Sequence, residues 1–229
     1  MKNNPTQSIG NKGKFVIKGW ILWLVVLFMV AMLVNCRVEY HDDDPPPTYE
    51  IQIVSDPDAD GDIAFSPPHN FTVSSAGTTG SVLAGIDPVF EDEFRGFLSF
   101  PLRGSHGVPT YADIESATLE IFISDVIECS PGTGVPLLID LVSFSPPILI
   151  ASDFDRAPLL TQYSNIVFAD DAGFFLSFDV TPLMVEAQRL DLNNFQLRFL
   201  LDSDLARSGL IEIEDNVLET APLLSVTYY

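Results

Sequence analysis

The sequence predicts an all-β fold, an antiparallel β-sandwich that resembles a jelly roll and has about ten strands and one short helix. Two observations predict it. After residue 49, apolar and polar residues alternate over short stretches, which is the period of a half-buried strand. Clusters of Gly, Pro and Asp separate these stretches and favour turns. Apolar residues make up 47% of the 229-residue chain, so disorder is excluded and one sizeable core can form.

The clearest predicted strand covers residues 117–123. Its residues Ala117, Leu119, Ile121 and Ile123 lie on one face, while mostly polar residues occupy the other. The same alternation recurs at residues 176–180, 195–201 and 224–228, and more weakly at 51–54, 63–66, 71–73, 97–102, 137–144 and 210–214. Short strands of this number in one chain indicate a single sandwich domain.

One helix is predicted, near residues 182–190. Thr181 is suited to the N-cap, and Pro182 to the first helical position, because proline has no N–H group to leave unpaired there. Leu183 and Ala187 then share one face of the helix, which should pack on the sandwich.

The first 36 residues have the composition of an export segment. All four lysines lie before residue 19, and the first acidic residue is Glu39. Residues 20–34 are uncharged and would span about 22 Å as a helix, which is short of the ~30 Å hydrocarbon core of a bilayer. A cationic head, a short apolar stretch and a cysteine are typical of an exported, lipid-anchored bacterial protein. We therefore expect residues 1–36 to be a signal peptide or membrane anchor.

The residues around Cys36 resemble a bacterial lipobox, in which the cysteine is acylated and becomes the first residue of the mature protein. Asn35 stands where a smaller residue is usual. An uncleaved anchor helix and simple secretion therefore remain as alternatives to lipidation. All three place residues 37–229 outside the cytoplasm, because the lysines stay on its side of the membrane. The expected location is the bacterial cell envelope, at the outer membrane, in the periplasm or on the cell surface, and the membrane is the expected partner of the N-terminal segment.

Residues 37–48 are predicted to form a tether, and residues 49–229 the β-sandwich domain. Three prolines in the tether favour an extended chain, and three aspartates repel one another. From residue 37 onward, seven arginines face 32 acidic residues, a formal charge of −25. This charge excludes nucleic acid as a partner and disfavours anionic lipid headgroups.

The sharpest local motif is acidic. Carboxylates stand at alternate positions and a glycine follows the third of them, which is how a calcium loop begins. The four aspartates are Asp56, Asp58, Asp60 and Asp62. The twelfth position, where such a loop has glutamate, is Pro67. Asp-Pro and Asp-Gly are also common in turns, so a calcium site and a plain turn are both open, and no cofactor is required.

No catalytic residue can be assigned from the sequence. His69 and His106 do not have the spacing of metal ligands, and Ser105 is not part of a Gly-x-Ser-x-Gly motif. Acidic neighbours disfavour a reactive thiolate at Cys129. This cysteine is a lone thiol if Cys36 is acylated, and the two can pair if it is not. We therefore expect a protein that is not an enzyme, with an unrecognised hydrolase as an alternative.

Four segments, in order, resemble the DNRLRE-domain family of exported bacterial β-sandwich modules. They are Arg95–Leu102 (Arg-x-x-Leu-x-Phe-x-Leu), Ile114–Ile121 (Ile-x-x-Ala-x-Leu), Phe178–Thr181 (x-Asp-Val-Thr) and Ala221–Tyr228 (Pro-x-Leu-x-Val-x-Tyr). Together they cover roughly residues 50–229. The resemblance implies a β-sandwich module of the kind appended to carbohydrate-active or surface proteins. The tryptophans usual in that family are absent from this domain, because Trp20 and Trp23 both lie in the export segment.

Two functions follow as expectations. The leading one is a structural or interaction domain of the envelope, with another envelope protein as partner. The alternative is a carbohydrate-binding module, since β-sandwich modules stack sugar rings on exposed aromatic side chains. Without tryptophan, that platform would use Tyr111 or Tyr163, both expected in turns. The negative charge repels acidic glycans, so the expected ligand is a neutral polysaccharide.

Overall fold

The computed structural model confirms the all-β fold class. It describes residues 47–104, 107–145, 148–215 and 219–229, with the side chains of residues 163–165 left out. Twelve strands belong to one curled sheet, and the paired strands run antiparallel. All ten predicted strands are present, and two further strands were not predicted.

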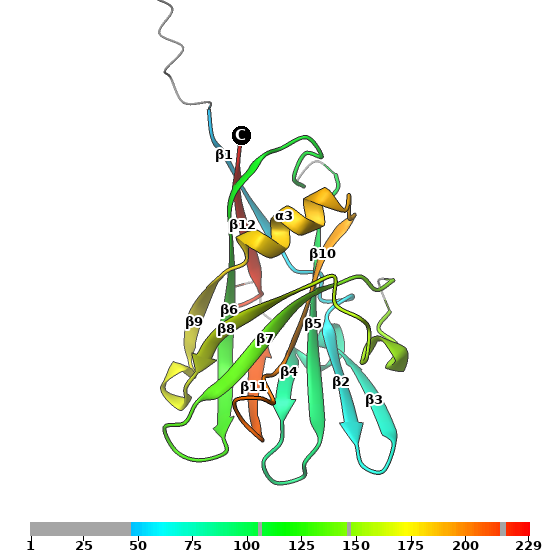
Figure 1. The fold of residues 1–229 in the computed structure, drawn as a ribbon, viewed down its shortest axis with the longest axis vertical. Coiled ribbons are helices and arrows are strands. Elements are labelled where there is room, and N and C mark those ends of the chain that lie inside the picture. The colour runs from blue at the N-terminus through cyan, green and yellow to red at the C-terminus, as the bar shows by residue number, and fades with distance from the viewer. Residues whose placement is uncertain (1–46, 105–106, 146–147, 216–218) are drawn as a thin grey trace, which may run out of the picture. The chain divides into compact units, whose positions relative to one another are not determined.

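Figure 1 labels the elements in chain order. The strands are β1 (Tyr49–Val54), β2 (Gly61–Ser66), β3 (Asn70–Ser75), β4 (Ser81–Ile86), β5 (Glu93–Pro101), β6 (Ile114–Glu128), β7 (Val135–Val142), β8 (Leu160–Val167), β9 (Phe174–Asp179), β10 (Asn194–Leu201), β11 (Gly209–Glu214) and β12 (Leu223–Tyr228). The helical segments are α2 (Ala76–Thr79), η1 (Ala151–Asp153), η2 (Ala169–Asp171) and α3 (Thr181–Arg189). Within the described residues, only α3 is longer than about one turn.

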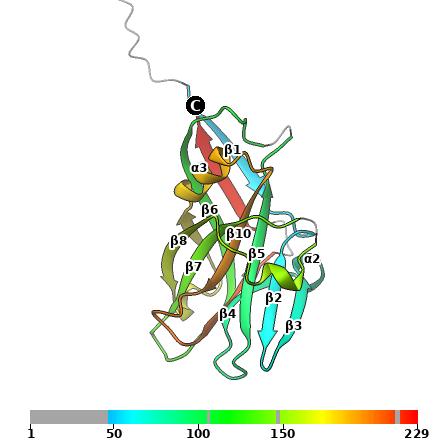
Figure 2. The same cartoon turned by 45° about the vertical axis from the view of Figure 1, so that its right-hand side comes forward.

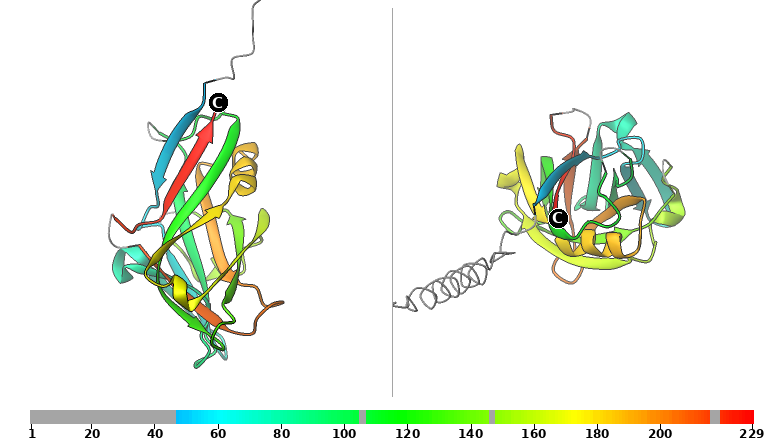
Figure 3. Two further views of the ribbon diagram at one scale, coloured as in Figure 1. Left: turned by 90° about the vertical axis from the view of Figure 1, so that its left-hand side faces the viewer. Right: turned by 90° about the horizontal axis from the view of Figure 1, so that it is seen from above.

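The main run of hydrogen-bonded strands has the order β1-β12-β6-β11-β4-β5-β10-β7-β8. β2 pairs with β5 and β3, and β9 pairs with β6. Figures 1 and 2 show the strands along the long axis of the domain, and the view from above in Figure 3 shows that they curl around a common interior. The first and last strands of the domain, β1 and β12, are direct neighbours.

The two strands that the sequence did not predict have compositions unusual for strands. β4 contains Ala84 and Gly85, which have low strand propensity, although Val82 and Ala84 are fully buried and β4 pairs with β11 and β5. β8 lies at the end of the strand order and is rich in polar residues, as expected for an edge strand. Pairing with their neighbours, rather than alternation in their own sequences, makes both segments strands.

One apolar core fills the interior of the curled sheet, and the faces predicted from the alternation point into it. The fully buried side chains of β6 and β10 include Ala117, Leu119, Ile121, Ile123, Phe195, Leu197 and Phe199. A smaller cluster contains Ile63, Phe97 and Phe144. Because burying such a side chain contributes ~1.5–3 kcal/mol, the core is the main source of stability.

Helix α3 packs on β6 and β8, and Figure 1 shows it crossing the sheet near the end where β1 and β12 lie. Leu183 and Ala187 are fully buried, as the predicted apolar face requires. The helix begins at Thr181, so this residue is not the N-cap that the sequence suggested. Its hydroxyl instead accepts a hydrogen bond of 2.9 Å from the backbone N–H of Ala117, which joins the helix to β6.

In the part of the chain that the structure describes, no helix has the length and apolar composition needed to cross a bilayer. The predicted export segment, residues 1–36, and most of the predicted tether lie outside the described residues.

A buried ion pair joins β10 to β7. Arg198 contacts Asp140 through Nε at 3.1 Å and through Nη2, and both residues are less than 5% exposed. Nη1 of Arg198 donates to the carbonyl oxygens of Phe154 and Arg156, while Thr161 donates to the other oxygen of Asp140. Burial of this pair is tolerated because each charged group is paired and hydrogen-bonded.

We predict that Arg198→Met lowers the free energy of unfolding by about 3–5 kcal/mol, because it leaves the carboxylate of Asp140 buried without a cation. Urea unfolding of the detergent-solubilised chain measures this change. The matched control is Arg189→Met, which removes a surface ion pair with Glu186. It should leave the urea concentration at the midpoint of unfolding unchanged within error. Equal losses in the two variants would contradict the prediction.

Candidate functional site

Four tyrosines gather in one pocket of the domain. Tyr49 is the first residue of β1, Tyr228 is the last residue of β12, and Tyr229 follows it. Tyr111 comes from the turn between β5 and β6. The pocket has a volume of about 290 Å³. Because β1 pairs with β12, Tyr49 lies directly opposite Tyr228, and residues from the two ends of the domain form one wall.

The tyrosine rings leave a large aromatic surface open to solvent. The rings of Tyr49 and Tyr228 stack with their centroids 5.8 Å apart and an angle of 27° between their planes. Tyr111 is 87% exposed, Tyr49 is 56% exposed and Tyr229 is 48% exposed. Exposed aromatic faces that line a concave surface are suited to stacking on a flat or weakly polar ligand.

Helix α3 holds the turn that contains Tyr111. The side-chain amide of Gln188 donates to the carbonyl oxygens of Pro109 and Ala112, at 2.8 and 3.0 Å. The backbone of Asp113 then exchanges two hydrogen bonds with Tyr229, at 3.0 and 3.1 Å. These contacts place the turn against the end of β12, so the pocket is built on hydrogen-bonded backbone.

A second hollow, of about 400 Å³, adjoins the tyrosine pocket and shares Ala112 and Tyr229 with it. Its lining includes Asp113, Gln188 and Arg189. Aromatic rings with carboxylate, amide and guanidinium groups beside them are the combination that fixes the orientation of a hydroxyl-rich ligand.

The two tyrosines singled out from the sequence lie in different kinds of element. Tyr111 lies in a turn and on the open surface, as expected. The expectation that Tyr163 lies in a turn is wrong, because it belongs to β8, opposite Leu138, and its side chain lies outside the described part of the structure. No local pattern indicated Tyr49 as a partner of Tyr228, since their proximity depends on strand pairing between distant segments.

The structure does not bring the four aspartates of the acidic motif to one point. Asp56 and Asp58 are exposed, and Oδ1 of Asp56 accepts a hydrogen bond of 3.2 Å from the backbone N–H of Asp58. Asp60 and Asp62 are buried and have different partners. Across the described ranges, no group of three or more His, Cys, Asp or Glu side chains has an arrangement that could hold a metal ion.

Gly61 has a different role from the one it would have in a calcium loop. It is the first residue of β2, and a Cβ atom at this position would lie 2.0 Å from the carbonyl oxygen of Ser74 in β3. Close approach of two backbones therefore requires glycine here. Next to it, Asp62 accepts a hydrogen bond of 3.3 Å from the backbone N–H of Leu83, and burial raises the pKa of Asp62 to about 6.

Asp60 forms a buried pair with Asp215, which follows β11. Oδ1 of Asp60 accepts a hydrogen bond of 2.6 Å from the backbone N–H of Ser99, and Oδ1 of Asp215 accepts one of 3.1 Å from the hydroxyl of Ser55. Burial, and then the adjacent charge of Asp215, raise the pKa of Asp60 well above its ordinary value. Burial also raises the pKa of Asp215 to about 6. When one carboxyl of the pair is protonated, it can donate to the other.

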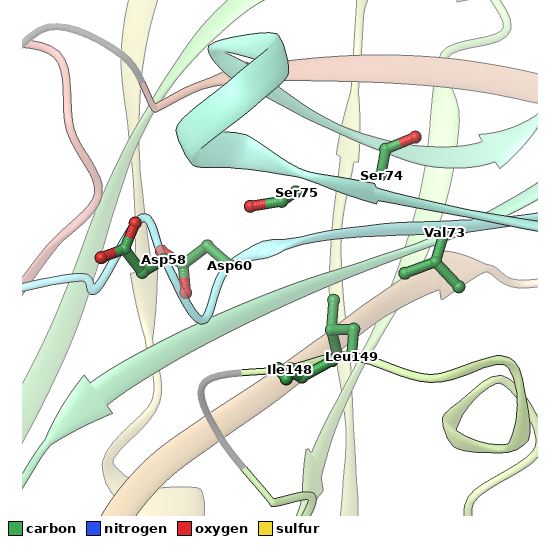
Figure 4. A pocket seen from close by; sticks show the side chains of 7 residues that line it. All are labelled: Asp58, Asp60, Val73, Ser74, Ser75, Ile148 and Leu149. Carbon is green, nitrogen blue, oxygen red and sulfur yellow. The ribbon is translucent and has the colours of Figure 1, made fainter.

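A pocket of about 240 Å³ lies beside this pair, and Figure 4 shows its lining. Asp58 and Asp60 come from the loop before β2, while Ser74 and Ser75 come from the end of β3. Apolar side chains complete the lining and include Leu149. The lining therefore combines acidic and hydroxyl-bearing side chains with apolar ones.

Two of the other candidate residues, His69 and Cys129, belong to the described part of the chain, and no contact found there suggests catalysis. His69 is exposed, with its ring 6.3 Å from the ring of Phe65. Cys129 is exposed and is a free cysteine among the described residues. His106 and Cys36 lie outside those residues, so the predictions for the lipid anchor and for a Cys36–Cys129 bridge stay predictions.

Comparison with known proteins adds no relatives. No protein-family model matches the chain, and no curated protein matches it either. The resemblance to the DNRLRE-domain family therefore stays a prediction from the four segments named above.

We predict that the free energy of unfolding, measured in EDTA, falls as the pH rises from about 4 to about 7. A raised pKa means that the folded state binds the proton more tightly than the unfolded chain. The stability that each of these carboxyl groups contributes is therefore complete below the ordinary pKa of 3.8, and it is lost as the pH rises through about 6. Urea unfolding at a series of pH values measures the profile.

The variant Asp60→Asn distinguishes the effect of the buried pair on the pH profile from the effect of general repulsion among the acidic residues. The amide that replaces the carboxyl group can still accept from Ser99 and can donate to Asp215, so this variant should be more stable than the parent protein at pH 7 and should have a flatter pH profile. The control, Asp58→Asn, changes an exposed carboxylate in the same loop and should leave the profile unchanged. A pH profile of Asp60→Asn that runs parallel to that of the parent protein would contradict the prediction.

Proposed function

We propose that this chain is a non-catalytic β-sandwich module, anchored in the bacterial cell envelope, and that its tyrosine pocket binds a neutral carbohydrate. The observation that supports the proposal best is the pocket formed by Tyr49, Tyr111, Tyr228 and Tyr229. An exposed aromatic surface suits either a sugar or a protein partner. The concave shape and the polar groups beside it favour sugar binding over the structural or interaction role expected first.

Stacking is the physical basis of the proposed binding. The C–H face of a pyranose ring is apolar, and its edge carries hydroxyl groups, so it fits an aromatic face with polar groups at the rim. Tyr111 and Tyr49 present the aromatic faces, and Asp113 and Arg189 in the adjoining hollow present the polar groups. The resemblance to modules of carbohydrate-active proteins agrees with this assignment.

Charge argues for a neutral sugar. The exported part of the chain has a formal charge of −25, and acidic polysaccharides would be repelled by it. A neutral glycan avoids this repulsion and needs only stacking and hydrogen bonds. Another envelope protein as the partner is the alternative that a binding screen would reveal.

We predict that the detergent-solubilised chain binds neutral glycans and not acidic ones on a glycan array. Tyr111→Ala should weaken binding to a neutral glycan about two- to tenfold, because loss of one stacking ring costs roughly 0.5–1.5 kcal/mol. Isothermal titration with the best glycan measures the change. Tyr111 is suited to substitution because it is almost fully exposed, and its removal should leave the fold intact.

Phe90→Ala is the matched control, since Phe90 is also a strongly exposed aromatic residue and does not line the pocket. It should leave binding unchanged. Absence of binding by the parent protein to all neutral glycans would contradict the proposed function. Equal weakening by Tyr111→Ala and Phe90→Ala would contradict the assignment of the pocket.

The proposed anchor has its own test at Cys36. In a bacterial host with a lipoprotein pathway, the parent protein should incorporate labelled palmitate and Cys36→Ala should not, because acylation requires the thiol. Fractionation then measures where the variant is found, and lipidation predicts that it leaves the membrane. A variant that stays membrane-bound would show that residues 1–36 are retained as an anchor helix.

A further inference from the structure

The carboxyl groups of Asp60 and Asp215 each have one oxygen without a partner. Oδ2 of Asp60 and Oδ2 of Asp215 are fully buried, and no hydrogen-bond donor contacts either of them within the described residues. Asp60 is 1% exposed and Asp215 is 3% exposed. A buried carboxylate oxygen that lacks a donor or a cation is costly, so these two oxygens need either a proton shared between them or a cation from solution.

Backbone contacts fix the two carboxyl groups next to each other. The loop before β2 is held by hydrogen bonds between Asp56 and Asp60, and between Asp56 and Ser99 of β5. Asp215 is held by a hydrogen bond from its own N–H to the carbonyl of Gly80. Ser99 bonds both Asp56 and Asp60, and Ser55, the residue before Asp56, donates to Asp215, so these contacts bring the two carboxyl groups together. The Oδ1 atom of each group is already engaged with the protein, which leaves the two Oδ2 atoms for another partner.

No side-chain cation of the described chain neutralises this site. The ion pairs of the described residues involve other acidic side chains, and none of them includes Asp60 or Asp215. All four lysines precede residue 19. The negative charge of Asp56 also acts on Asp215. A site with two buried carboxylates and a third nearby attracts a cation from solution.

We propose that Oδ2 of Asp60, Oδ2 of Asp215 and Oγ of Ser55 bind a calcium ion. The hydroxyl of Ser55 donates its hydrogen to Oδ1 of Asp215, and its oxygen retains a lone pair for a cation. This proposed set of calcium ligands differs from the alternating aspartates of the sequence motif. It takes only Asp60 from the motif and adds residues from two other segments.

The chemistry of the donors selects calcium among common cations. Every donor is oxygen, which suits a hard cation, and carboxylates, hydroxyls and waters are ordinary calcium ligands. Two carboxylates balance the charge of a divalent ion. Waters would complete the coordination number of six to eight. Magnesium requires a tighter octahedral set, which ligands from three separate segments are less able to form.

The proposed ion would join three parts of the chain that are far apart in the sequence. Ser55 follows β1, Asp60 precedes β2 and Asp215 follows β11. Ser55 and Asp215 are 160 residues apart. Binding would therefore stabilise the folded state, because the unfolded chain does not hold these groups together. The test does not depend on sugar binding, since none of these residues lines the tyrosine pocket.

The test compares the full-length chain in detergent, first freed of metal with EDTA, with and without CaCl₂ at pH 7. Saturating calcium should raise the melting temperature by about 5–10 °C, and isothermal titration should give one site per chain. Asp60→Asn and Asp215→Asn should each abolish both responses. Each variant is first shown to be folded by circular dichroism, and the second keeps the test valid if the first does not fold.

Asp58→Asn is the matched control, because Asp58 is an exposed carboxylate of the same loop, and this variant should keep the full calcium response. The proposal is overturned if calcium neither binds the parent protein nor raises its melting temperature. It is also overturned if the response is lost in Asp58→Asn and retained in Asp60→Asn. An equal shift with MgCl₂ at the same concentration would overturn the assignment to calcium.

Discussion

Burial of one face of β6 in the common core is the constraint on which the rest of the structure depends. β6 is 15 residues long and pairs with β9, β11 and β12, and α3 packs on it. A slip of one residue in any of these pairings would turn core side chains to solvent, so the register is strongly determined. β12 then places Tyr228 and, through β1, Tyr49, while β11 places Asp215. Both the tyrosine pocket and the carboxyl pair therefore owe their positions to the core.

Alternation in the sequence was enough to predict the strands that have one buried face. Residues 117–123 and 195–201 are clear cases, because their apolar side chains are buried as their spacing indicates. β4 and β8 could not be predicted this way. Small residues such as Gly85 weaken the pattern in β4, and polar residues along the sheet edge hide it in β8. Their strand structure comes from partners far away in the chain, which alternation within a segment does not reveal.

The candidate sites were less predictable than the fold, because they depend on contacts between distant segments. Tyr111 could be identified from its polar turn, but its neighbour Tyr49 is placed by pairing with Tyr228 at the other end of the domain. Asp60 stood out as part of an acidic motif, whereas Asp215 had no local signal. Alternate positions in the motif also suggested a convergence that the loop does not produce, since its first two aspartates face solvent and Asp60 faces inward.

The pairing of β1 with β12 has a mechanical consequence. Tyr49 is both the first residue of β1 and part of the tyrosine pocket, and the predicted tether precedes it directly in the sequence. A polymer held in the pocket and dragged away from the cell would transmit its pull to the tether over a few residues, so most of the sheet would bear no load. Because both forces would act at the Tyr49–Tyr228 end of the antiparallel ladder, tension would peel β1 away from β12 from that end, and the hydrogen bonds from Tyr49 to Val54 would resist one after another.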